Sequence, residues 1–348
     1  MDKIIRCGVC GLGRIGWHFH LPAISKTSGL TLAAVADPLA ERLTEAQQTF
    51  GVKHTFTDWK DMADRELIDL AVIASPTIFH REQCEYFISK GIDVFCDKPM
   101  ALDLAEAEAM ADFAQKHQRK LMVYQPHRLT GTAIKAKELI ASGKLGRIYQ
   151  IRRNCYSFVQ RNDWQAFLSQ GGGMLNNYGA HFIDQLLFVG GDKKVTDLRC
   201  VTERLLSAGD AEDFVAVAMR GESGILYRMD INMAHPLPGA EMEISGTAGS
   251  AVFQDNVWKI KYCEKLSEIS ATIDMAAPGR RYPAKEQNFI EEEAVNPAVN
   301  SSDWYVYCRD YFGGNAAPFV PLSETLEVMR ILKECRESAR VFGDQRAK

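Results

Sequence analysis

Residues 4–16 read Ile4-Ile5-Arg6-Cys7-Gly8-Val9-Cys10-Gly11-Leu12-Gly13-Arg14-Ile15-Gly16, an apolar run followed by the pattern G-x-G-x-x-G. In this pattern Gly11 allows a tight turn, Gly13 lets backbone amides approach a pyrophosphate, and Gly16 lets the next helix pack on the strand. The pattern is weak alone, but here it lies between an expected strand and an expected helix. It predicts a dinucleotide site that includes Arg14 and Ile15, although a solvated surface charge is the simpler interpretation of Arg14.

Asp37 supports this prediction, because it follows the second expected strand. A carboxylate at that position accepts hydrogen bonds from the adenosine ribose and repels a 2′-phosphate. We therefore expect NAD rather than NADP. The alternative is a glycine-rich turn that binds nothing, with Asp37 as an ordinary helix cap before Pro38.

The first 125 residues alternate short apolar runs with amphipathic stretches. The expected strands are Ile4–Cys10, Thr31–Ala36, Lys53–Phe56, Ile68–Ala74, Asp93–Asp97 and Lys120–Tyr124, and the expected helices are Ile15–Lys26, Ala40–Phe50, Arg81–Lys90 and Leu104–His117. Parallel strands need crossover helices, so this α/β alternation predicts a doubly wound parallel sheet. We assign residues 1–125 to a Rossmann dinucleotide-binding domain.

The pattern changes after about residue 130. A helix over Thr132–Ser142 is followed by expected strands at Ile148–Tyr156, Thr196–Leu206, Phe214–Arg220, Gly224–Ala234 and Ala240–Ser245. Their period-two alternation predicts a large, mostly antiparallel, open-faced sheet in an α+β domain, residues 126–348. Residues 274–302 are turn-rich and predict a long loop. We expect the final helix, residues 323–342, to pack back toward the first domain.

Composition indicates a folded protein that binds small molecules. The chain has 348 residues, 46% of them hydrophobic, and a formal net charge of −4, which gives no electrostatic reason to expect nucleic acid or a membrane surface. Nine scattered cysteines favour reduced thiols, and with no long apolar segment we expect a soluble, cytoplasmic protein. No metal is expected at Cys7 and Cys10, which lie in an apolar run, or at His18 and His20, which would face different sides of a helix.

A candidate active site follows the fourth and fifth expected strands. The fourth ends in Ser75-Pro76-Thr77, with His80 opening the next helix, and the fifth ends in Asp97-Lys98-Pro99. Ligands bind at the carboxyl ends of strands in open α/β sheets, so these segments should pass near a nicotinamide ribose. A structural role at the helix start is an equal alternative for His80.

Taken together, the motifs resemble the Gfo/Idh/MocA family of oxidoreductases. The matching segments are the G-x-G-x-x-G loop, Asp97-Lys98-Pro99, Gly143-Lys144-Leu145-Gly146, Gly171-Gly172-Gly173-Met174-Leu175-Asn176-Asn177-Tyr178-Gly179-Ala180-His181, Ile244-Ser245-Gly246-Thr247-Ala248-Gly249-Ser250, and the closing helix up to Gly343. The resemblance implies NAD(P) held between a Rossmann domain and an open-faced sheet domain. It also implies hydride transfer at a hydroxyl carbon of a sugar, a glycoside or an inositol-like cyclitol.

Carried over by position, the family's lysine is Lys98 and its histidine is His181, but Asn177 stands where the family usually has aspartate. If residues 177–189 are helical, Asn177, His181 and Asp184 share one face. We then expect His181 to be the general base and Lys98 the second catalytic group, with Asp184 and Asn177 orienting them. The alternative is that His181 is a core histidine and Asp184 a surface charge.

On the substrate side, Arg128 is the first candidate, joined by Asn176, Asn177, His181 and Lys98, while Tyr124, His127, Tyr156 and Trp164 could equally be core or interface residues. Two other functions remain open: a redox-neutral NAD-bearing glycoside hydrolase, and a non-catalytic sensor of dinucleotide or sugar. We expect a homodimer or homotetramer formed through the uncovered face of the second sheet.

Overall fold

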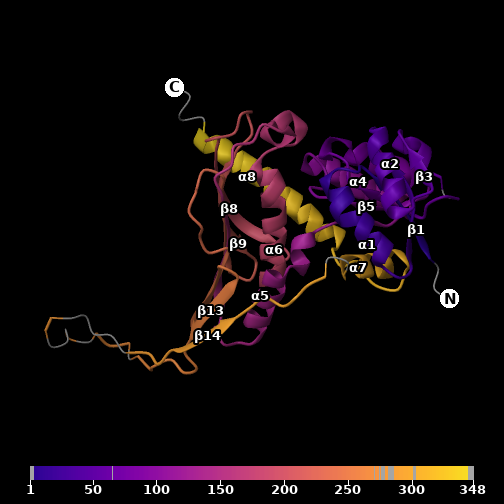
Figure 1. Ribbon diagram of the computed structural model, residues 1–348. Coiled ribbons are helices and arrows are strands. Elements are labelled where there is room, and N and C mark those ends of the chain that lie inside the picture. The colour runs from indigo at the N-terminus through magenta and orange to yellow at the C-terminus, as the bar shows by residue number, and fades with distance from the viewer. Residues whose placement is uncertain are drawn as a thin grey trace.

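The computed structural model describes residues 4–64, 66–269, 271–273, 275, 279–280, 286–300 and 303–343. Figure 1 shows two sheets side by side, with helix α8 (Leu322–Gly343) running between them. The first sheet has six parallel strands in the order β3-β2-β1-β4-β5-β6. The expected doubly wound parallel sheet is confirmed.

The strands of the first sheet are β1 (Ile5–Cys10), β2 (Leu30–Ala36), β3 (His54–Phe56), β4 (Leu70–Ile73), β5 (Asp93–Cys96) and β6 (Leu121–Val123). The helices around it are the π-helical turn η1 (Gly16–His20), α1 (Leu21–Lys26), α2 (Ala40–Phe50), the 3-10 turns η2 (Trp59–Met62) and η3 (Thr77–Phe79), α3 (His80–Ser89) and α4 (Leu104–Lys116). Strand β4 is buried along its whole length, as expected for a strand covered on both faces.

The strand order indicates where a ligand would bind. The chain turns from one half of the sheet to the other between β1 and β4, and this switch point is where open α/β sheets bind ligands. The loops after these strands are fixed by neighbours: Gly11 N donates to Ala36 O at 2.8 Å, and Ala74 N donates to Cys10 O at 2.8 Å. The glycine loop and the 75–80 segment therefore lie next to each other.

The second sheet has eight strands in the order β14-β13-β12-β11-β7-β10-β9-β8. They are β7 (Ile148–Tyr156), β8 (Val195–Glu203), β9 (Phe214–Gly221), β10 (Leu226–Asn232), β11 (Met242–Gly246), β12 (Gly249–Gln254), β13 (Val257–Tyr262) and β14 (Ile290–Ala294). All neighbouring strands are antiparallel except β10 and β7, which are parallel. The mostly antiparallel sheet is thus confirmed.

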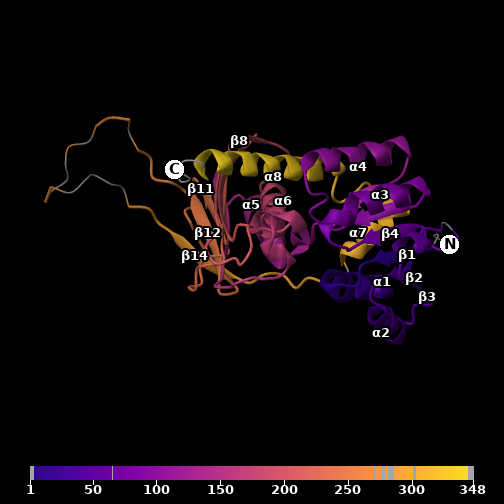
Figure 2. The same ribbon diagram turned by 90° about the horizontal axis from the view of Figure 1, so that it is seen from above.

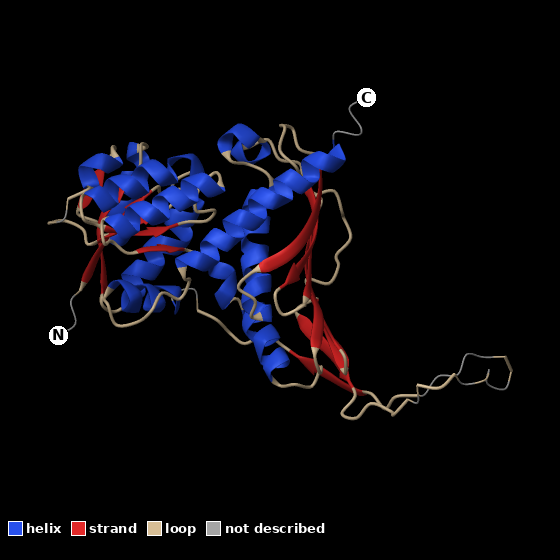
Figure 3. Cartoon of the chain, turned by 180° about the vertical axis from the view of Figure 1, so that it is seen from behind, coloured by secondary structure: helices blue, strands red, loops and turns tan. Residues whose placement is uncertain are grey.

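Helices cover one face of this sheet. In Figure 3, α5 (Gly131–Ala141), α6 (Ala180–Gly190) and α8 lie on the side that faces the first sheet. The short helices η4 (Pro126–Leu129), η5 (Trp164–Ala166), η6 (Leu168–Gln170) and η7 (Leu175–Gly179) complete this region. The buried apolar core is continuous across the molecule, running from Ile73 through α6 to Val217.

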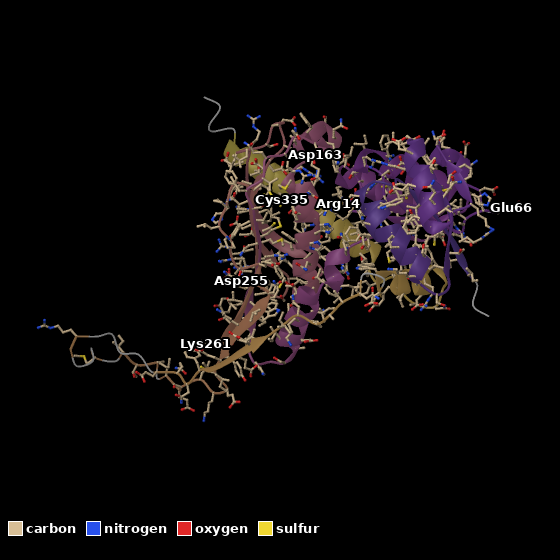
Figure 4. All side chains as sticks on the ribbon, in the orientation of Figure 1. Arg14, Glu66, Asp163, Asp255, Lys261 and Cys335 are labelled. Carbon is tan, nitrogen blue, oxygen red and sulfur yellow. The ribbon has the colours of Figure 1, made fainter. Side chains whose placement is uncertain are left out.

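The expected long loop over residues 274–302 is partly wrong. It contains β14, which pairs with β13. Lys261 of β13 is labelled in Figure 4, and its Nζ donates a hydrogen bond to Glu291 Oε1 of β14 at 2.6 Å. Strands β12 and β13 were not expected either. Residues 274, 276–278, 281–285 and 301–302 of that expected loop lie outside the described residues.

Two C-terminal helices reach the first sheet. Helix α7 (Asp303–Phe312) buries Trp304, Tyr305 and Cys308 in the same apolar cluster as Val9 and Phe95. Helix α8 contacts α4 and β6, and Figure 2 shows it beside α4. Helices α7 and α8 together therefore pack against both sheets. A division of the chain into two domains at residue 125 stays a prediction. None of the described helices has both the length and the apolar character needed to span a membrane.

Candidate active site

The glycine loop has the geometry of a phosphate cradle. Gly11 has a φ of +90°, which favours glycine. A side chain at Gly16 would place its Cβ 2.0 Å from Gly11 O, whereas the Cβ position of Gly13 has no atom within 4 Å. Space is therefore left at Gly13, where a pyrophosphate needs it, and the residues fit a bound dinucleotide. Arg14 and Ile15 are exposed beside this space, and Figure 4 labels Arg14.

Asp37 holds the glycine loop. Its carboxylate is buried and accepts hydrogen bonds from Leu12 N at 2.7 Å and Leu39 N at 3.0 Å. The guanidinium of Arg42 lies 3.3 Å from the same carboxylate. The acid thus lies at the loop, as the sequence predicts.

The 75–80 segment is held by side chains that point inward. Ser75 Oγ donates to Gln83 Oε1 at 2.6 Å. Thr77, the first residue of η3, is buried. His80 is buried between two carbonyl oxygens, with Nε2 2.9 Å from Ser75 O and Nδ1 3.0 Å from Pro99 O. Burial lowers the pKa of His80. These contacts tie this segment to the Lys98–Pro99 turn. They support the structural role for His80, and its contact with a cofactor stays a prediction.

Lys98 is the point at which the first sheet meets the helices of the second. Its Nζ donates to Asn177 O at 2.7 Å and lies 3.4 Å from Asn177 Oδ1. Burial lowers the pKa of Lys98 to about 8, and the charge of Asp97 opposes this shift. An amine with such a pKa exchanges protons readily near neutral pH.

A buried network of polar side chains next to Lys98 was not predicted from the sequence. His20 Nε2 lies 3.3 Å from Asp97 Oδ1, and His20 Nδ1 lies 2.5 Å from the hydroxyl of Tyr305. The only sequence signal was the pair His18 and His20, which we considered as a metal site. Tyr305 on α7, the partner of His20, is far away in the sequence.

His181 lies near Lys98 but lacks the acid expected behind it. Among the described residues its buried Nδ1 has no hydrogen-bond partner, and its ring stacks on His127 with centroids 4.1 Å apart and planes 7° apart. Burial, with the charge of Lys98 and the neighbouring His127, holds the pKa of His181 well below its usual range. This imidazole is therefore neutral at physiological pH.

Asp184 pairs with Arg128 and not with His181, so the structure does not show the orienting contact expected from the sequence. Its carboxylate accepts two hydrogen bonds from Arg128, at 2.8 and 2.5 Å. Arg128 Nη1 also lies 2.7 Å from Glu324 Oε2, and both Arg128 and Asp184 are buried. Arg128 therefore pairs with both acids, and its contact with a substrate stays a prediction. The expected common face assumed a regular α-helix, but residues 175–179 form the π-helical turn η7, which shifts Asn177 relative to His181 and Asp184 on α6.

The two asparagines have different partners. Asn176 Nδ2 donates to Gly171 O and Gly172 O, both at 3.1 Å, and its Oδ1 accepts from Arg336. These contacts hold the glycine-rich turn, and a substrate contact of Asn176 stays a prediction. Asn177 Nδ2 donates to Gln165 Oε1 at 3.1 Å, while its carbonyl side faces Lys98. The structure thus brings Lys98 and Asn177 together, with His181 one helical turn beyond.

These features define an oxidoreductase with an NAD-binding Rossmann fold. A family model described as "Oxidoreductase family, NAD-binding Rossmann fold" matches residues 5–125, and one described as "GFO/IDH/MocA C-terminal domain" matches residues 133–252. The chain belongs to the Gfo/Idh/MocA family, as its motifs predict.

Named relatives agree with this assignment. The chain is 27% identical over 256 residues to the rhizopine catabolism protein MocA of Rhizobium meliloti, covering 71% of this chain and 77% of that protein. It is 27% identical over 263 residues to the myo-inositol 2-dehydrogenase of Thermotoga maritima, covering 73% and 76%. The WlbA dehydrogenase of Bordetella pertussis, solved with NADH and UDP-GlcNAcA, shares the fold, with a TM-score of 0.76, 23% identity and 98% of each chain covered.

Proposed function

We propose that this protein is an NAD-dependent dehydrogenase that transfers a hydride between nicotinamide and a hydroxyl carbon of a sugar, glycoside or cyclitol. The observation that carries the proposal is the contact between Lys98 Nζ and the backbone of Asn177, which joins the dinucleotide half to the segment bearing His181. Relatives named as dehydrogenases of inositol, apiose and glucosides support the substrate class.

The residues divide the chemistry between them. The bound dinucleotide supplies the ring that accepts or returns the hydride. Lys98, whose pKa is lowered to about 8, takes the hydroxyl proton during oxidation and returns it during reduction. The neutral ring of His181 hydrogen-bonds the reacting oxygen, and this replaces the role of general base that the sequence alone suggested. Asn177 holds Lys98 in position.

NAD rather than NADP is favoured by the carboxylate of Asp37 beside the glycine loop. A homodimer or homotetramer formed through the uncovered face of the second sheet is also part of the proposal. So is a cytoplasmic location, which remains a prediction from composition.

The proposal is tested with a panel of cyclitols, aldoses and glycosides, each supplied with NAD and with NADP, while NADH or NADPH absorbance is followed. We expect at least one polyol to reduce NAD, and the Lys98→Met variant to lose this activity. Glycoside cleavage without net NADH formation would instead support the redox-neutral hydrolase. Tight dinucleotide binding with no turnover of any polyol or glycoside would support the sensor.

A further inference from the structure

His127 and His181 come from different parts of the fold and meet face to face. His127 lies in η4, directly after the last strand of the first sheet, whereas His181 lies on α6 against the second sheet. Their ring centroids are 4.1 Å apart and their planes differ by 7°. Offset or edge-on contacts are preferred for most aromatic pairs, so a nearly parallel pair at this distance is a specific arrangement.

The backbone of His127 is fixed against α6. His127 O accepts hydrogen bonds from Gln185 Nε2 at 2.9 Å and from Thr130 Oγ1 at 3.1 Å. The ring also packs against Phe182, with centroids 5.7 Å apart. The backbone contacts hold the segment whatever the side chain is, so they give no reason for an imidazole at this position.

The ring nitrogens indicate a role beyond packing. Within the described part of the chain, Nδ1 of His127 and Nδ1 of His181 are both buried without a hydrogen-bond partner. A buried polar atom left unpaired costs roughly 1–3 kcal/mol, so each such atom calls for an explanation, and a role in the site is one. Neither Nε2 atom is among those buried without a partner. Each ring therefore turns one nitrogen inward and leaves the other available to the site.

The charged groups around the pair disfavour a proton on either ring. Lys98 approaches from the end of β5 and Arg153 from β7, and both lower the pKa of His127, which burial brings to about 3. The neighbouring acids are already paired: Asp184 with Arg128, Glu241 with Arg153 at 3.5 Å, and Asp97 with His20. Tyr178 is half-buried one turn before Phe182, and the two rings pack at an interplanar angle of 38°. Among the residues that the structure describes, no carboxylate is therefore left to stabilise an imidazolium at this pair.

We propose that His127 is a positioning residue of the active site, which holds the His181 ring in place and uncharged by stacking on its face. The inference rests on the proposed function, because it explains how His181 hydrogen-bonds the reacting oxygen while Lys98 carries the proton. It also accounts for Asn177: with a stacked imidazole in place of an acid, His181 has no need of a charge partner.

The test uses protein labelled at histidine with ¹³C and ¹⁵N, with the His181 signal assigned by its loss in a His181→Asn variant. In the native protein His181 should stay neutral between about pH 5 and 8, the range in which ordinary histidines titrate. His127→Gln removes the flat ring face and admits water, so His181 should begin to titrate in that range. His127→Phe keeps the face, so His181 should stay neutral.

Turnover provides the second measurement. His127→Gln should lower kcat by up to about 10²-fold, the order expected when a reacting group is misplaced by about 1 Å, and should add an acidic limb to the pH profile. His127→Phe should restore most of that loss. A native His181 that titrates normally would overturn the proposal, as would a His127→Gln variant with unchanged titration and rates. The spectra need no turnover, so they decide this point even if no polyol is oxidised.

Discussion

At the scale of single residues, the chemistry of the site depends on the environment of Lys98. Its ammonium group is half-buried and donates to the carbonyl of Asn177 at 2.7 Å. Burial disfavours the charged form, so the pKa of Lys98 falls to about 8. A proton acceptor is thereby available at a pH at which an exposed lysine would remain charged.

Replacing Lys98 by methionine tests this role. We expect Lys98→Met to lower kcat by roughly 10²–10⁴-fold, the usual contribution of an acid–base group, while NADH binding measured by fluorescence survives. In the native enzyme, kcat/KM for oxidation should rise with pH through about pH 8, because the amine accepts a proton only after losing its own. This limb should vanish in the variant. Lys116→Met, at an exposed position of α4, is the control, and a Lys98→Met enzyme with native rates would contradict the role.

We expect coenzyme choice to depend on one residue, Asp37. In Asp37→Ser the carboxylate that would repel a 2′-phosphate is gone, and Arg42, 3.3 Å away in the native chain, becomes free to bind one. We expect the ratio of kcat/KM for NADP to that for NAD to rise at least about tenfold, a change of about 1.4 kcal/mol. Glu45→Ser, exposed on α2, should leave the ratio unchanged. An unchanged ratio in Asp37→Ser would show that specificity lies elsewhere.

The sequence predicts where part of the candidate site lies in the fold. The glycine loop, Asp37 and Lys98 are predicted because each follows a strand whose carboxyl end has a fixed place in the sheet. The partners of Asp184 and His181 could not be predicted, because Arg128 and His127 approach from another element. The π-helical turn before α6 also shifts Asn177 relative to His181 and Asp184. Only the packing of η4 against α6 shows which histidine stacks and which acid is neutralised.

At the scale of elements, a buried ion cluster joins η4, α6 and α8. Arg128 bonds Asp184 through two nitrogens, and Glu324 on α8 completes the cluster at 2.7 Å. Removing one partner of a buried pair leaves a charge poorly compensated, which is more costly than a lost surface ion pair.

We therefore expect Asp184→Asn to lower the free energy of unfolding by about 3 kcal/mol in urea titrations. The matched control is Asp112→Asn, at an exposed position of α4, which should change stability by less than about 0.5 kcal/mol. An Asp184→Asn protein as stable as the native one would mean that Glu324 alone satisfies Arg128. The account of the cluster would then be wrong.

Elements with a clear local pattern were predicted, and those that depend on distant partners were not. The strands of the first sheet follow from their apolar runs. Strand β14 has three consecutive glutamates and is recognisable only beside the lysines of β13, such as the Lys261–Glu291 pair. Helix α7 has no clear helical pattern in the sequence, and its aromatic rings are explained only by their packing against the first sheet. The parallel pairing of β10 with β7 likewise has no local signal.

At the scale of the whole molecule, the second sheet has helices on one face only (Figure 3). Val252 alternates with buried Ala251 and Phe253, and so faces away from the helices, opposite Glu243 on the neighbouring strand. A second copy covering this face would bury it. Light scattering after size exclusion should give the mass of a dimer or tetramer, and Val252→Glu, which would bury a charge in the proposed contact, should shift it toward the monomer. Gln115→Glu on exposed α4 is the control, and a monomeric native protein would contradict the proposed assembly.

The central claim is that Lys98 and His181 act on the same substrate oxygen beside the nicotinamide. The most direct measurement is a crystal structure of the protein with NADH and a bound polyol. The account predicts Lys98 Nζ and His181 Nε2 both within about 2.6–3.2 Å of one hydroxyl oxygen, with the His127 ring still stacked behind His181. A polyol held by other residues, with Lys98 and His181 turned away from its reacting carbon, would contradict it.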